Sequence, residues 1–127
     1  MMVRFLLLLP VLMMLSCSAG KDVWQAAPQM WQELTLRVET RPESVSTGMN
    51  EFLIIAGHQQ RGFINNLLVE VRTDSSGATW KQAMPDGALG VFRRALPVKD
   101  PQHEHLYVRL TRHHQHGELT FDLVAKQ

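Results

Sequence analysis

Short segments of alternating apolar and polar residues recur along the chain. In residues 34–40 (LTLRVET), leucine and valine would share one face and polar residues the other, which is typical of a half-buried β-strand. The same alternation is found in residues 67–72, 106–111 and 118–124. Each of these segments predicts one strand with a core-facing side.

Three further segments depart from this alternation. Residues 51–57 (EFLIIAG) are apolar on both faces and predict a central strand, because seven residues are too few for a convincing helix. Residues 80–85 predict a weaker strand. In residues 89–98 the adjacent Arg93 and Arg94 break the alternation, so a bulge or an edge position is expected there.

Turn-forming residues separate these segments at short intervals, and no amphipathic helix is predicted. The pattern therefore predicts an all-β fold, an antiparallel immunoglobulin-like β-sandwich of about seven strands spanning residues 34–127. A small β-barrel would produce a similar pattern and is the alternative.

The N-terminus predicts export. Arg4 precedes an apolar run of eleven residues, Phe5 to Leu15, and small residues follow, as in secretory signal peptides. The run is shorter than the roughly 20 residues that span a bilayer. Residues 1–16 are therefore expected to be a signal peptide.

Cys17 is the only cysteine of the chain. The stretch Met14-Leu15-Ser16-Cys17 resembles the lipobox of bacterial lipoproteins, although Met14 and Leu15 are not the commonest residues there. The resemblance implies cleavage before Cys17 and a diacylglycerol on its sulfur. The competing interpretation is ordinary cleavage after Ala19.

The lipoprotein interpretation predicts a protein anchored on the periplasmic side of the outer or inner membrane. Ser18 is not the aspartate associated with inner-membrane retention, which favours the outer membrane. Cleavage after Ala19 would instead produce a soluble periplasmic protein. Residues 17–33 are expected to form a tether and then a docking segment, in which Trp24 and Trp31 cover an edge or end of the domain. The alternative is that these two tryptophans contact a partner.

Composition limits the kinds of partner. The chain has 13 basic and 12 acidic side chains, and removal of Arg4 with the signal peptide would balance them. No basic field is then left to hold nucleic acid, so none is expected as a partner. The pair Arg93 and Arg94 could instead bind an anion or a carboxylate of an envelope protein, and the simpler interpretation is a solvated edge.

Five of the six histidines lie between residues 103 and 116. His103 and His105 are predicted at the start of one strand, and His113, His114 and His116 in the hairpin loop at its other end. The last three could turn toward one copper, zinc or nickel ion, for which imidazole is a suitable ligand. The simpler interpretation is a polar hairpin tip that binds no cofactor.

No motif of catalysis is present: the chain lacks a G-x-S-x-G elbow, a phosphate loop, a C-x-x-C pair and an H-E-x-x-H helix. The sequence therefore predicts a protein that is not an enzyme.

A strand ending near Pro42, the segments GMNEFLI (48–54) and DGALGVF (86–92), and a closing hairpin occur in an order that resembles small secreted bacterial domains of the YtkA-like and wider immunoglobulin-like sort. The resemblance implies a β-sandwich of the cell envelope, and some such domains are linked with metal handling. This chain lacks the methionine and histidine paired near the Asp-Gly segment, so no binding residue is carried over. The leading hypothesis is a non-catalytic lipoprotein that acts as a binding or accessory module, and the alternative is a metal-binding or metal-delivery protein.

Overall fold

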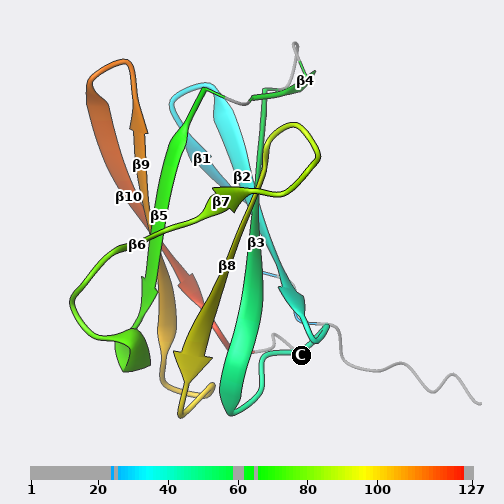
Figure 1. Ribbon diagram of the computed structural model, residues 1–127, viewed down its shortest axis with the longest axis vertical. Helices are drawn as coiled ribbons and strands as arrows, with labels where there is room; N and C mark the ends of the chain where they lie inside the picture. Colours follow the sequence, from blue (N-terminus) through cyan, green and yellow to red (C-terminus); the bar gives the residue numbers. More distant parts are fainter. Residues whose placement is uncertain (1–23, 25, 59–61, 65, 125–127) are drawn as a thin grey trace, which may run out of the picture.

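The computed structural model describes residues 24, 26–58, 62–64 and 66–124, which form two antiparallel sheets (Figure 1). The strands are β1 (Gln29–Trp31), β2 (Leu34–Arg41), β3 (Gly48–His58), β4 (Gly62–Phe63), β5 (Leu68–Thr73), β6 (Lys81–Gln82), β7 (Met84–Pro85), β8 (Val91–Val98), β9 (His105–Arg112) and β10 (Gln115–Asp122). One turn of 3-10 helix, η1 (Asp74–Ser76), follows β5.

The strand order is that of an immunoglobulin-like sandwich. One sheet has the order β1-β2-β3-β8-β7, with β4 beside β3, and the other has the order β10-β9-β5-β6. The runs β2-β3-β8-β7 and β10-β9-β5-β6 correspond to strands A-B-E-D and G-F-C-C′ of that fold. The predicted fold class is confirmed, and the alternative of a small barrel does not hold, because the described strands form two separate sheets.

The core lies between the sheets, where the alternating patterns meet. Most residues predicted to point inward are buried, as in β2, where Leu34 and Leu36 are 0% exposed, whereas Leu119 of β10 is only partly buried. The predicted central strand is confirmed in β3, which lies between β2 and β8. Members of the core cluster from the two sheets include Leu36, Ile54, Phe92, Val69, Val108 and Phe121.

Two local predictions need correction. The weak strand at 80–85 is two short strands, because the chain crosses at Ala83 from β6 in one sheet to β7 in the other. The bulge expected near the paired arginines is wrong, because β8 pairs with β3 without interruption from Val91 to Val98. The expected edge position is found for residues 94–98, because β7 pairs with β8 only at Phe92 and Arg93.

A buried carboxylate closes one end of the sandwich. Glu104 is 8% exposed, and its oxygens accept hydrogen bonds from the backbone amides of Ser75 (2.9 Å), Lys99 (2.7 Å) and Asp100. Burial would raise the pKa of Glu104, but these hydrogen bonds outweigh it and lower the pKa. The side chain thereby joins η1 to the connection between β8 and β9.

Candidate functional site

The histidine-rich hairpin has a tighter turn than the sequence predicts. β10 begins at Gln115, which pairs with Arg112, so only His113 and His114 form the turn. Both have positive φ, 51° and 63°, as a two-residue type I′ turn requires. His116 therefore lies in a strand and not in a loop, and its Nδ1 is 3.0 Å from the hydroxyl of Thr111.

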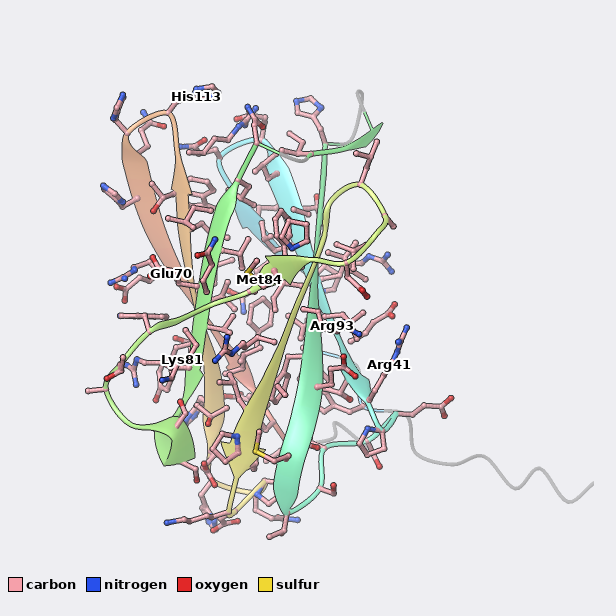
Figure 2. The ribbon with its side chains drawn as sticks, in the orientation of Figure 1. Arg41, Glu70, Lys81, Met84, Arg93 and His113 are labelled. Carbon is pink, nitrogen blue, oxygen red and sulfur yellow. The ribbon has the colours of Figure 1, made fainter. Side chains whose placement is uncertain are left out.

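The three candidate metal ligands are exposed at this tip, where Figure 2 labels His113. They do not converge: among the residues that the structure describes, no three histidine, cysteine, aspartate or glutamate side chains are placed to hold a metal ion. A copper, zinc or nickel site at His113, His114 and His116 is thus not preformed.

The other two clustered histidines pair with carboxylates at the opposite end of β9. The Nδ1 of His103 is 2.7 Å from Asp100. His105 lies between two acids, with Nδ1 3.4 Å from Asp74 and Nε2 3.2 Å from Asp122. Because opposite nitrogens of one ring contact these acids, His105 links η1 to the end of β10 and does not form a chelating set with both.

Trp24 packs into the domain itself, so the alternative that it contacts a partner is wrong. It is 2% exposed and belongs to the hydrophobic core, and its indole Nε1 donates a 3.2 Å hydrogen bond to the carbonyl of Asp122. A large apolar ring is more stable in the core than in water. The folded unit therefore extends to Trp24.

Trp31 also packs within the sandwich. It is partly buried, packs against the core, and its indole lies against Gly117 of β10, where a Cβ atom would collide with the ring. Gln29 donates a 2.7 Å hydrogen bond to the carbonyl of Thr120, and Glu33 pairs with Arg112 at 2.6 Å. The segment predicted to dock does so onto β9 and β10 of its own chain.

Arg93 and Arg94 border a shallow hollow on the six-stranded sheet, and Figure 2 labels Arg93 and Met84 there. Arg93 is paired with Glu51 at 3.0 Å and lies 3.7 Å from Asp86. Its guanidinium therefore already has two acids of its own chain, which weakens the expectation that it binds a partner's carboxylate.

A cluster that the sequence did not reveal covers the outer face of the four-stranded sheet. This outer cluster consists of Glu70 and Arg72 of β5, Trp80 before β6, and Tyr107 and Arg109 of β9. The guanidinium carbon of Arg72 lies 4.0 Å from the Tyr107 ring centroid and 5.1 Å from that of Trp80. That of Arg109 lies 4.6 Å from the Trp80 centroid. These distances are within the range of cation–π attraction.

Hydrogen bonds fix the geometry of the outer cluster. Arg109 donates to both oxygens of Glu70, through Nε at 3.1 Å and Nη2 at 2.9 Å, and this hydrogen bond raises the pKa of Arg109. The Tyr107 hydroxyl donates to Asp74 at 2.9 Å, which raises the pKa of Tyr107. Burial would raise the pKa of Asp74, but bonds from the His105 amide and from Tyr107 outweigh it and lower that pKa.

The side chains of Trp80, Arg72 and Tyr107 are all partly exposed. The two rings and the guanidinium are therefore accessible to a partner, while their contacts with each other hold them in place. The alternation in residues 67–72 and 106–111 indicated which of the strand side chains point outward. It did not indicate that Arg72 is opposite Tyr107 and Glu70 opposite Arg109, which is the register of β5 and β9.

Comparison with models of protein families, with curated proteins and with solved structures finds no match to this chain. The candidate lipid-bearing residue, Cys17, and the predicted signal peptide lie outside the described residues. Within the described part, no helix is long and apolar enough to cross a membrane.

Proposed function

We propose that this chain is a non-catalytic binding module of the cell envelope that holds a protein partner against the outer face of its four-stranded sheet. The observation that supports this proposal is the outer cluster. Tryptophan, tyrosine and arginine are the residue types that dominate the binding energy of protein interfaces. Here they are partly exposed, and their contacts with each other reduce the entropy that binding would cost.

The export signal and the Cys17 motif support an envelope location with a lipid anchor. Trp24 is fixed in the core, so the chain between Cys17 and Trp24 can reach at most about 25 Å. An anchored domain would then keep the end that holds Trp24 near the membrane. The hairpin tip, at the far end of β10 (Figure 1), would point away from it.

The anchor is tested by labelling cells with radioactive palmitate. The label is expected in the natural chain and not in a Cys17→Ala variant. Label that fails to enter the natural chain, or that persists in the variant, would remove the lipid anchor and leave cleavage after Ala19 as the explanation.

The binding face is tested by mild crosslinking of intact envelopes, followed by purification of the chain. Replacement of Arg72 and Trp80 by alanine is expected to abolish the crosslinked complex. The matched control replaces Arg37 and Glu39, which are exposed on the other sheet, and should retain it. A complex that survives the first pair of changes and is lost with the second would contradict the proposed face.

A further inference from the structure

The two arginines of the outer cluster differ in what occupies their hydrogen-bond donors. Arg109 uses Nε and Nη2 on the carboxylate of Glu70. Arg72 lies over the rings of Tyr107 and Trp80, and its side chain has no hydrogen bond or ion pair with any residue that the structure describes. Rings contact the flat faces of a guanidinium, whereas its N–H donors point outward from its edge.

We infer that Arg72 is a binding site for a carboxylate, namely an aspartate or glutamate side chain of the protein partner. This inference rests on the proposed function and specifies the chemistry of the partner. A guanidinium presents a planar fork of N–H groups that matches a carboxylate with two parallel hydrogen bonds. Contact with two rings holds that fork in place before the partner arrives.

The surroundings of Arg72 favour a singly charged group. Its strand neighbour Glu70 is neutralised by Arg109, and Asp74 accepts the hydroxyl of Tyr107. Asp74 keeps its negative charge while it accepts this hydroxyl, and it would repel a doubly charged phosphate more strongly than a singly charged carboxylate. Because the Tyr107 hydroxyl already donates its hydrogen bond to Asp74, Arg72 supplies the hydrogen-bond donors of this site.

The test is a titration of the isotope-labelled full chain, in a neutral detergent, followed by the NMR signals of arginine Nε–H groups. The probe is sodium acetate, compared with sodium chloride at equal ionic strength. Acetate is expected to shift the Arg72 signal saturably and to leave the Arg109 signal in place, since Glu70 occupies its donors. If acetate and chloride shift the Arg72 signal equally, or if acetate shifts the Arg72 and Arg109 signals equally, Arg72 is not a carboxylate site.

Two further arms identify the ligand class. Arg72→Lys keeps the positive charge but not the planar fork, and should weaken acetate binding at least about threefold, measured from backbone amide shifts beside residue 72. Inorganic phosphate that binds more tightly than acetate would overturn the carboxylate assignment. If acetate binds at Arg72 but no envelope partner depends on this face, the site stands and the proposed function fails.

Discussion

Glu104→Gln changes one buried carboxylate into an amide of nearly the same size. The carboxylate of Glu104 accepts backbone hydrogen bonds from Ser75, Lys99 and Asp100. The amide retains one acceptor oxygen and turns an NH2 group toward a backbone N–H. We therefore expect η1 and the 99–104 connection to lose much of their attachment to each other.

The expected cost follows from the number and type of these bonds. A hydrogen bond to a charged group contributes about 1.5–3 kcal/mol, and a buried donor left without a partner costs about 1–3 kcal/mol. The amide oxygen, in the Oε2 position, can keep the bonds from Lys99 and Asp100 without charge assistance, while the Ser75 amide loses its acceptor. The free energy of unfolding should therefore fall by about 2–4 kcal/mol at neutral pH. The same change at exposed Glu39 should alter it by less than about 0.5 kcal/mol.

The assay is urea unfolding of both variants and the natural chain, followed by circular dichroism. The pKa of Glu104 is lowered from its usual value of 4.5 in the folded state. Its stabilising effect is therefore fully present above the pKa of the unfolded chain and is lost as pH falls through the folded pKa. The difference in unfolding free energy between the natural chain and the Glu104→Gln variant should shrink as the pH falls below about 4.5. A cost no larger than that at Glu39, or a difference independent of pH, would refute this role of Glu104.

Three further changes test packing and turn geometry by the same unfolding assay. Thr40→Val should raise the unfolding free energy by about 1 kcal/mol, because the buried Thr40 hydroxyl has no hydrogen-bond partner in the described structure; a loss would contradict this. His113→Asn with His114→Gly should raise it by about 1 kcal/mol, since these residues suit positive φ in a type I′ turn, and should leave partner crosslinking unchanged. Gly117→Ala should lower it by about 1–3 kcal/mol through collision with Trp31, and less so in a Trp31→Ala background; equal losses in both backgrounds would exclude that contact.

The inward and outward faces of the main strands could be predicted from the sequence because the side-chain period of a strand is two. This is why Arg72 and Tyr107 could be placed on an outer face. Their contact could not be predicted, because it depends on the register between β5 and β9, which are far apart in the sequence. The outer cluster therefore becomes visible only once the strands are paired.

The hairpin and Trp24 show two other limits. Consecutive histidines are not the Asn-Gly pair that signals a two-residue turn, so the sequence predicted a longer loop than His113 and His114 form. Trp24 lies outside any alternating segment. The burial of Trp24 depends on its contact with the end of β10, where the Asp122 carbonyl accepts a hydrogen bond from the indole N–H.

The central claim, that a partner binds the outer face of the four-stranded sheet, is tested most directly by site-specific photocrosslinking in intact cells. A photoreactive residue would replace Gln82, which is exposed and lies opposite Glu70 in the register of β5 and β6. The matched control places the same residue at Glu39, which is exposed on the other sheet. A crosslinked protein of defined mass from position 82 and none from position 39 is the predicted result. Crosslinks from position 39 alone would place the partner on the opposite face and contradict the claim.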